Sequence, residues 1–242
     1  MAIKGKKLIV FNWKMNPTTL KKAVSLAKIS DFKNVVVIPP FLFTEEIGKI
    51  LKKAELGAQD LSWEEGGAVT GEVSARELKN LRVRYAIVGH SERLQKLRET
   101  DEIINKKVLA ALKNGLKIIL CVGEDLKIRK KGKKAVEKFI KTQLEKDLKG
   151  IFKNYNLKAN SLIVAYEPIW AIGTGRSDTP QDAYDMIQFI KQTLKAKVLY
   201  GGSVSGKNIK NFVIYKEIDG FLIGHASLKS KEVEKIIKAL NK

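Results

Sequence analysis

The chain reads Leu162-Ile163-Val164-Ala165-Tyr166-Glu167-Pro168 at its sixth apolar run. The first four of these residues are uninterrupted apolar side chains, which predict a strand buried on both faces, as in a parallel sheet. Pro168 stops a strand or a helix from continuing. We therefore expect Glu167 to lie at the carboxyl end of a buried strand.

Seven further apolar runs occur along the chain, and each is followed by a predicted helix or helical turn. The runs cover residues 8–12, 35–38, 56–60, 85–89, 117–122, 197–200 and 220–223. Such alternation predicts an α/β fold with a parallel sheet. Eight units in a chain of 242 residues predict a single domain over residues 1–242, a closed (β/α)8 TIM barrel with eight parallel strands. An open, doubly wound sheet is the alternative.

Charge and cysteine content indicate which partners and which cellular location to expect. The 46 Lys and Arg residues exceed the 26 Asp and Glu residues, and the net charge of +20 attracts anions. The densest basic cluster, residues 129–134, contains no aromatic side chain, so we expect no specific nucleic-acid partner. A single cysteine, Cys121, cannot form an intramolecular disulfide, and we find no membrane-length apolar stretch or signal-peptide pattern. These observations predict a cytoplasmic protein without a membrane partner.

Polar residues follow most of the predicted strands. In a barrel these positions converge on one face, where the chemistry takes place. The candidates are Asn12, Lys14, Gln59, Asp60, His90, Cys121, Glu124, Glu167, the turn Gly201-Gly202-Ser203 and the pair Gly224-His225. Two histidines and a lone cysteine offer no metal constellation. We therefore expect no metal site.

The residues after Glu167 are unusually apolar for a loop. Ile169-Trp170-Ala171-Ile172 is followed by Gly173 and Gly175, which permit unusual backbone angles. This pattern predicts a flexible lid that excludes water from a base at Glu167. The alternative is a loop that packs Trp170 on the body of the protein, with Glu167 in a salt bridge.

The other candidates suggest the chemistry beneath such a lid. His90 ends a strand and begins a predicted helical turn, where a charged imidazolium is disfavoured, so a neutral imidazole is expected to donate to a carbonyl oxygen. Glu167 is the complementary base. The glycine-containing turns at 200–204 and 223–225 present backbone N–H groups that bind anions. Together these groups suit proton abstraction next to the carbonyl of a small phosphorylated sugar.

Eight motifs of the chain resemble the triosephosphate isomerase family, in the family's order. They are Phe11-Asn12-Trp13-Lys14-Met15-Asn16 and residues 57–60, 70–74, 88–93, 121–124, 165–175, 200–204 and 219–228. The resemblance implies an isomerase of glycolysis and gluconeogenesis that interconverts dihydroxyacetone phosphate and D-glyceraldehyde 3-phosphate through an enediolate, without a cofactor.

The resemblance also implies a role for each site residue. Glu167 moves the proton, His90 polarises the carbonyl, Lys14 stabilises negative charge and Asn12 shapes the oxyanion site. The phosphate is expected at the backbone N–H groups of Gly173, Ser203, Gly224 and His225, with Asn12 and Lys14 also at the substrate. Glu92 and Cys121 are expected to support these groups from behind.

The family forms dimers or tetramers in which a loop enters the neighbouring subunit. The corresponding loop here, residues 62–72, has full length. The resemblance implies a homodimer in which Thr70 lies near Asn12 and His90 of the partner subunit. We expect an isolated subunit to be nearly inactive.

Three positions depart from the family pattern. His225 stands where the family usually has a glycine, which is either a tolerated substitution or places an imidazole close to the phosphate. Arg176 replaces the lysine usual at the second hinge of the lid. Residues 193–197 form a shorter connection than usual, expected at the face opposite the site and without effect on catalysis.

Two other classes of protein compete with this interpretation. A phosphosugar aldolase needs a Schiff-base lysine near the middle of a strand, and Lys14 lies beyond a strand end. A metal-dependent epimerase needs more ligands than this chain offers. A non-catalytic barrel that binds phosphate or polyanions has no need of Asn12, Lys14, His90 and Glu167 together.

Overall fold

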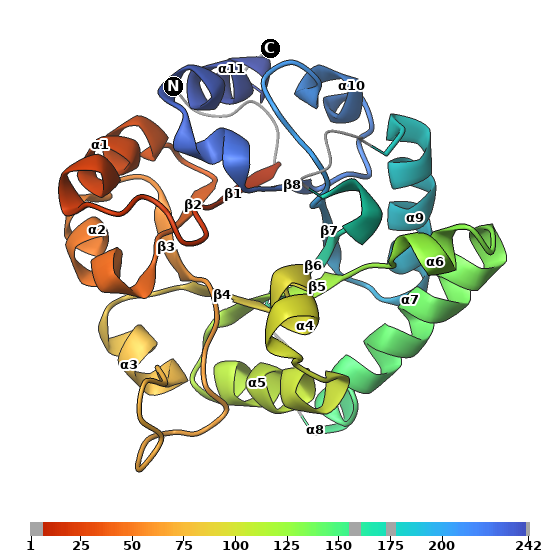
Figure 1. Cartoon of the computed structure of the whole chain (residues 1–242), viewed down its shortest axis with the longest axis horizontal. Coiled ribbons are helices and arrows are strands. Elements are labelled where there is room, and N and C mark those ends of the chain that lie inside the picture. The colour runs from red at the N-terminus through yellow and green to blue at the C-terminus, as the bar shows by residue number, and fades with distance from the viewer. Residues whose placement is uncertain (1–6, 155–160, 173–177, 241–242) are drawn as a thin grey trace.

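A computed structural model, which describes residues 7–154, 161–172 and 178–240, shows eight parallel strands closed into a barrel (Figure 1). The strands are β1 (Leu8–Asn12), β2 (Val35–Ile38), β3 (Glu55–Ala58), β4 (Tyr85–Val88), β5 (Lys117–Val122), β6 (Leu162–Tyr166), β7 (Lys197–Tyr200) and β8 (Gly220–Ile223). Each strand pairs with its neighbours in the chain, and β8 closes on β1, where Leu222 aligns with Val10. The predicted (β/α)8 barrel is confirmed, and the alternative of an open, doubly wound sheet is excluded.

Helices surround the barrel on all sides (Figure 1). The longer ones are α1 (Leu20–Ser30), α5 (Asp101–Lys113), α7 (Lys133–Asp147), α9 (Pro180–Thr193) and α11 (Ser230–Leu240). The shorter ones are α2 (Thr44–Ile50), α3 (Ala75–Asn80), α4 (Ser91–Leu97), α6 (Leu126–Arg129), α8 (Ile151–Asn154) and α10 (Ile209–Val213). Three 3-10 helices, η1 (Phe41–Phe43), η2 (Ile169–Ala171) and η3 (His225–Leu228), complete the described elements. None of the described helices is long and apolar enough to cross a membrane.

Each strand is buried on both faces, as the uninterrupted apolar runs predict. In β1, Leu8 and Val10 belong to the cluster inside the barrel, whereas Ile9 and Phe11 belong to the cluster between the barrel and the helices. Side chains therefore alternate between two apolar layers instead of between core and water.

The weak apolar pattern of β3 has a structural reason. Gly57 faces the crowded interior, because a Cβ at this position would lie 2.7 Å from Cγ1 of Ile38. A glycine is needed where another side chain approaches the backbone so closely. The side chain of Ile38 thus occupies the space that a side chain at position 57 would need.

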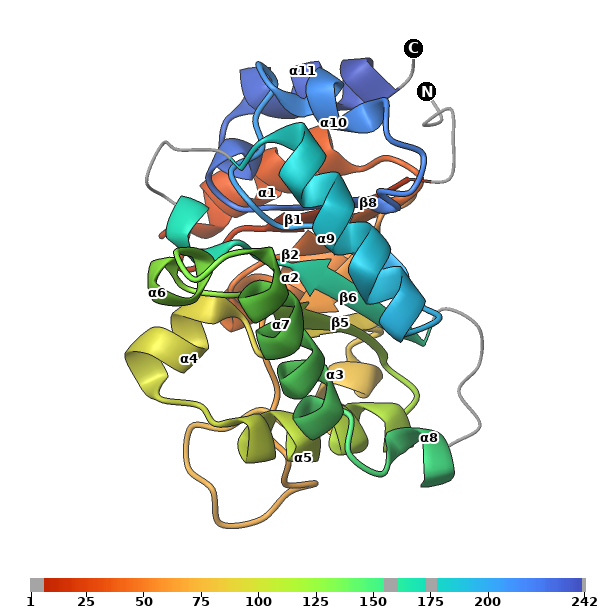
Figure 2. The ribbon, with the colours of Figure 1, turned by 90° about the vertical axis from the view of Figure 1, so that its right-hand side faces the viewer.

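The two ends of the barrel carry different elements. Helices α4 and α6 and the 3-10 helix η2 gather at the end where the strands finish (Figure 2). Residues 193–197 lead into the start of β7, so they lie at the opposite end, as expected.

The loop over residues 62–72, between β3 and α3, extends beyond the ring of helices (Figures 1 and 2). Its base is held to α5, because Glu65 pairs with Lys113 and the ammonium group of Lys106 lies 6.0 Å from the ring centre of Trp63. The loop is exposed from Trp63 to Glu72 in the single chain.

Candidate active site

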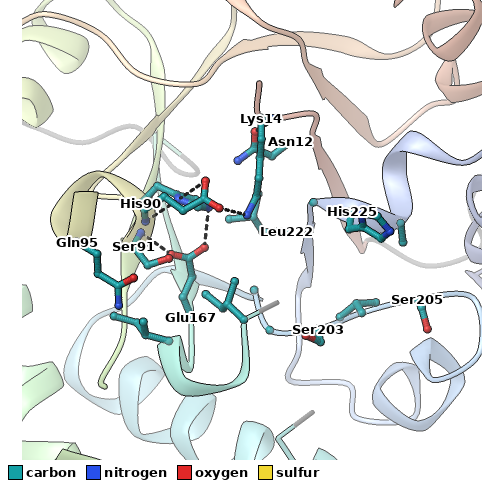
Figure 3. A pocket seen from close by; sticks show the side chains of 18 of the residues that line it. Asn12, Lys14, His90, Ser91, Gln95, Glu167, Ser203, Ser205, Leu222 and His225 are labelled. Atoms are coloured by element: carbon teal, nitrogen blue, oxygen red, sulfur yellow. Dashed lines mark hydrogen bonds and ion pairs between the residues drawn. The ribbon is translucent and has the colours of Figure 1, made fainter. Parts of the chain in front are cut away.

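A cavity of about 800 Å³ opens at the carboxyl ends of the strands (Figure 3). It brings together most of the residues singled out from the sequence, among them Gly201 and Gly202 of the predicted turn and Ile169 and Ile172 of the predicted lid. The others are Asn12, Lys14, His90, Glu92, Glu167, Ser203, Gly224 and His225. Residues from β1, β4, β6, β7 and β8 or the segments after them thus converge, as a closed barrel requires.

His90 is placed by a sharp turn between β4 and α4. Gly89 makes the turn with a φ of 73°, which is open to glycine and strained for other residues. His90 then caps α4, and its Nδ1 accepts a hydrogen bond from the backbone N–H of Glu92 at 3.2 Å. A ring nitrogen that accepts a hydrogen bond carries no proton. The imidazole in this arrangement is neutral, with its proton on Nε2.

Glu167 lies directly opposite this proton. Its Oε1 is 3.2 Å from Nε2 of His90, and its Oε2 accepts a hydrogen bond from the backbone N–H of Ser91 at 3.0 Å. The glutamate is almost completely buried, with 2% of its surface exposed. Its backbone N–H donates to the carbonyl of Val122, which continues the ladder between β5 and β6 past the strand end. Both carboxylate oxygens are therefore oriented before a substrate arrives.

Cys121 lies behind Glu167, inside the barrel. Burial raises the pKa of its thiol, and the charge and hydrogen bond of Glu167 raise this pKa further. The thiol therefore stays protonated and acts as a donor toward the glutamate. The structure places Cys121 outside the lining of the cavity.

Lys14 enters the cavity on a strained backbone. Its φ is 54°, in the left-handed region that costs an ordinary residue about 1 kcal/mol. Two side chains hold this conformation: Asn12 Oδ1 accepts the N–H of Lys14 at 3.0 Å, and Gln59 Nε2 donates to its carbonyl at 2.7 Å. The side chain of Asn12 is therefore turned toward the backbone of Lys14.

Glu92 holds the ammonium group of Lys14 in place. The distance between Lys14 Nζ and Glu92 Oε1 is 2.7 Å. Burial alone would raise the pKa of Glu92, but the hydrogen bond and positive charge of Lys14 hold it below its usual value. The carboxylate is thus fixed in its charged form beside the cavity.

The wall after β7 and β8 consists largely of backbone and small side chains. Ser203, Gly224 and His225 lie on this wall. Sequence reasoning missed Asn208, which accepts the N–H of Ser205 at 2.8 Å and donates to the carbonyl of Ser203 at 2.8 Å. A Ser-x-x-Asn spacing at 205–208 is the signal of such a turn.

The first part of the predicted lid is anchored to the body of the protein. Trp170 Nε1 donates to Glu124 Oε1 at 2.9 Å, and the phenol of Tyr166 donates to the same carboxylate. Burial raises the pKa of Glu124. Ser203 Oγ donates to the carbonyl of Ala171 at 2.7 Å, which ties this segment to the wall after β7 and β8. Residues 173–177, which include Gly173, Gly175 and Arg176, lie outside the described part of the chain.

Asp60, another strand-end candidate, does not line the cavity. It joins a cluster of four charged side chains, completed by Arg93, Glu99 and Lys107, of which all but the half-buried Arg93 have buried side chains. Burial raises the pKa of Asp60 to about 6, while the positive charge of Lys107 opposes the shift. The cluster joins the end of β3 to α4 and α5. Its role in the fold is therefore to hold the helix that carries His90.

No group of three or more His, Cys, Asp or Glu side chains in the described residues is arranged to hold a metal ion. The cavity is instead lined by one lysine–glutamate pair, one histidine–glutamate pair and a wall of turns. Such a site can bind an anion, polarise an oxygen and move a proton.

Comparison with known proteins agrees with this chemistry. The family model described as triosephosphate isomerase matches residues 7–240. Proteins named triosephosphate isomerase from Caldanaerobacter subterraneus subsp. tengcongensis and Thermoanaerobacter pseudethanolicus are 43% and 42% identical over 248 residues, which is 95% of this chain and 98% of each relative. A protein of the same name from Dictyoglomus turgidum is 40% identical over 252 residues, covering 97% of this chain and 99% of the relative.

Proposed function

The chain belongs to the triosephosphate isomerase family and interconverts dihydroxyacetone phosphate and D-glyceraldehyde 3-phosphate, and we propose that Glu167, His90, Lys14 and Asn12 carry out this reaction in the cavity described above. The observation that carries the proposal is the pairing of Glu167 with the Nε2 of His90, 3.2 Å apart at the floor of the cavity. One group is a carboxylate that accepts a proton, and the other is a neutral donor.

The first step removes a proton from C1 of dihydroxyacetone phosphate. Glu167 takes this proton, and the electron pair of the C–H bond becomes part of a C=C bond as the C2 carbonyl oxygen gains negative charge. To reach the substrate, Oε1 of Glu167 must exchange its contact with His90 for the hydrogen on C1. Burial of the carboxylate leaves few waters to compete for it.

His90 stabilises the enediolate oxygen. Its Nε2–H is free to turn from Glu167 to the oxygen, while Nδ1 remains bound to the N–H of Glu92. The neutral ring thus donates without first losing a charge, an arrangement for which this enzyme family is the standard example. Glu167 then returns the proton to C2, and the proton of the C1 hydroxyl group moves to the oxygen on C2. The product is D-glyceraldehyde 3-phosphate.

Lys14 supplies positive charge beside the developing oxyanion. The strained backbone at Lys14 is held by Asn12 and Gln59, and its ammonium group is held by Glu92 at 2.7 Å. A charge that is fixed in advance costs little reorganisation when the transition state forms. Cys121 and Glu92 act from behind the reacting groups, on Glu167 and Lys14 respectively.

The substrate phosphate binds on the wall after β7 and β8, opposite Glu167. Backbone N–H groups of Ser203, Gly224 and His225 are proposed to hold it, together with Gly173, which lies outside the described residues. The hydrogen bond from Ser203 to Ala171 supports a role of the lid in this contact, because it links the wall to the start of the lid. Phosphate binding would then draw the lid over the cavity.

The test is a coupled assay on D-glyceraldehyde 3-phosphate. We expect turnover by the natural chain and by Glu145→Gln, an exposed carboxylate on α7. Glu167→Gln should lose activity by about 10²- to 10⁴-fold. Equal turnover by the natural chain and Glu167→Gln would show that another group is the base. Only a natural chain that shows no turnover above the uncatalysed rate would favour the non-catalytic phosphate-binding barrel.

The chain is further proposed to form a homodimer through residues 62–72. Exposed apolar side chains support this proposal, since Met15 is 90% and Leu42 is 89% exposed in the single chain. Large apolar side chains with this exposure are candidates for burial against a partner. Thr70 would approach Asn12 and His90 of the partner subunit. We also propose one domain over residues 1–242, a cytoplasmic location, and no specific nucleic-acid or membrane partner.

A further inference from the structure

His225 occupies a distinctive place on the wall proposed to hold the phosphate. The segments after β7 and β8 contribute Gly201, Gly202, Ser203, Val204, Ser205, Asn208, Gly224, His225 and Ala226 to the cavity lining. Among these described residues, His225 is the one whose side chain can carry a charge. Figure 3 shows it across the cavity from His90 and Glu167. The phosphate wall therefore has a single ionisable side chain among its described residues.

The backbone accepts a side chain at position 225 without strain. The described non-glycine residues with a positive φ are Lys14, Asn34, Arg82 and Arg98, and His225 is not among them. The preceding carbonyl of Gly224 accepts hydrogen bonds from the N–H of Ser227 at 2.9 Å and from its hydroxyl at 2.6 Å. The turn that presents His225 is thus fixed by neighbours other than the imidazole.

The imidazole is available for a ligand. No described residue forms a hydrogen bond or an ion pair with it, and His225 is exposed at the cavity. Lys14 lies nearby, because a Cβ at Gly224 would be 2.9 Å from Cε of Lys14. However, the ammonium group of Lys14 is already paired with Glu92 at 2.7 Å. The charge of Lys14 is therefore partly balanced before an anion enters.

We propose that the imidazole of His225 contacts the substrate phosphate and determines how tightly this isomerase binds it. The inference rests on the proposed phosphate site and adds a side-chain donor to its backbone N–H groups. A hydrogen bond to a charged oxygen is stronger than one between neutral groups. The contact is remote from the reacting carbons and is made equally in the ground and transition states. It affects KM more than kcat.

Four proteins test this contact: the natural chain, His225→Gly, His225→Gln and Lys229→Gln. Gln keeps an N–H donor without the ring, and Lys229 is an exposed cation next to η3 that does not line the cavity. We would measure kcat and KM for D-glyceraldehyde 3-phosphate, the inhibition constant of inorganic phosphate, and phosphate binding by calorimetry. Circular dichroism would check the fold of each variant.

We expect His225→Gly to raise KM and the phosphate inhibition constant by about tenfold, with a much smaller change in kcat. His225→Gln should recover part of the loss, and Lys229→Gln should match the natural chain. Unchanged phosphate affinity in His225→Gly would overturn the proposal. An equal loss of phosphate affinity in Lys229→Gln would also overturn it, because the affinity would then depend on the overall positive charge of the protein and not on a contact with the imidazole.

Calorimetry keeps this test separate from the test of the catalytic mechanism. If the natural chain bound phosphate but showed no turnover that depends on Glu167, the proposed catalytic roles would fail. The difference in phosphate affinity between the natural chain and His225→Gly would still decide the role of the imidazole.

Discussion

Nε2 of His90 lies 3.2 Å from Oε1 of Glu167, while Nδ1 of the same ring accepts the backbone N–H of Glu92. The helix that begins after His90 thereby fixes the position of the ring proton. The histidine presents a donor to the cavity, and the glutamate presents an acceptor. The two groups proposed to carry out the reaction are thus paired with each other before a substrate enters.

The proton position of His90 can be observed directly. Nitrogen-15 NMR of the folded protein should show Nε2 protonated and Nδ1 unprotonated, because Nδ1 is an acceptor. His90→Gln should lower kcat by about 10²-fold or more, since the amide cannot reproduce both contacts. Two protonated ring nitrogens in the free protein would contradict the neutral donor.

Lys107 is the buried centre of the charge cluster beneath α4. Only 2% of its side chain is exposed, and its Nζ lies 2.6 Å from Asp60 and 2.5 Å from Glu99. Lys107→Met leaves two carboxylates facing each other without this cation, so we expect a loss of about 3–5 kcal/mol in the free energy of unfolding. Lys106→Met, on the exposed face of the same helix, should change it by less than about 0.5 kcal/mol. Urea titration would measure the free energy of unfolding of both variants. A loss in Lys107→Met as small as that in Lys106→Met would show that the cluster contributes little to stability.

Asp147 is a buried carboxyl group at the end of α7. It is fully buried, neither of its oxygens has a hydrogen-bond partner, and burial raises its pKa to about 8, with a further contribution from Asp101. The folded state therefore holds a proton that the unfolded state releases above its usual pKa near 3.8. The contribution of Asp147 to the free energy of unfolding therefore decreases as pH rises from about 4 toward 8.

Asp147→Asn should remove this pH dependence. We expect the variant to be more stable than the natural chain at pH 8, by on the order of 2 kcal/mol, with a smaller advantage at pH 5. Glu145→Gln on the exposed face of α7 serves as the control. Chemical denaturation at the two pH values measures the difference. An advantage that shrinks as pH rises would show the sign to be wrong.

The proposed dimer predicts a large effect at an exposed position. Met15 follows Lys14 and is 90% exposed in the single chain. Met15→Asp would place a charge in the proposed interface, so we expect dissociation and a large loss of activity. Analytical ultracentrifugation gives the oligomeric state, and the coupled assay gives the rate. Full activity in a sedimenting monomer would rule out dependence on the partner subunit.

The strands were predictable because both of their faces are apolar. A continuous apolar run is typical of a strand that is buried on both faces, as every strand of a closed barrel is. Seven of the eight runs showed this pattern clearly. The run at β3 was weak because Gly57 leaves its inner position to Ile38. Local sequence does not reveal which side chain from another strand will fill such a space.

Helix ends were less predictable because distant side chains set them. Helix α2 ends at Ile50, since the carboxylate of Asp31 accepts the backbone N–H groups of Lys52, Lys53 and Ala54. By contrast, the start of α3 is set locally, because Ser74 and Glu77 form a capping box that the sequence displays.

Much of the cavity lining could be predicted from the strand ends, but the contacts between its side chains could not. Strand ends identified His90 and Glu167, and the closure of β4, β5 and β6 side by side brings them together. Asp60 was expected at the site but lies in a charge cluster outside the cavity. The packing of α4 and α5 causes this, because it places Arg93 and Lys107 around Asp60. No spacing along the chain indicates that arrangement.

Hydrogen exchange into the substrate in D₂O tests the central claim most directly, because it reports proton removal at carbon by Glu167. Proton NMR should show the natural chain placing solvent deuterium on the carbon next to the carbonyl, with Glu145→Gln at the same rate. Glu167→Gln should exchange more slowly by about 10²- to 10⁴-fold. Exchange by Glu167→Gln at the rate of the natural chain would show that another group is the base.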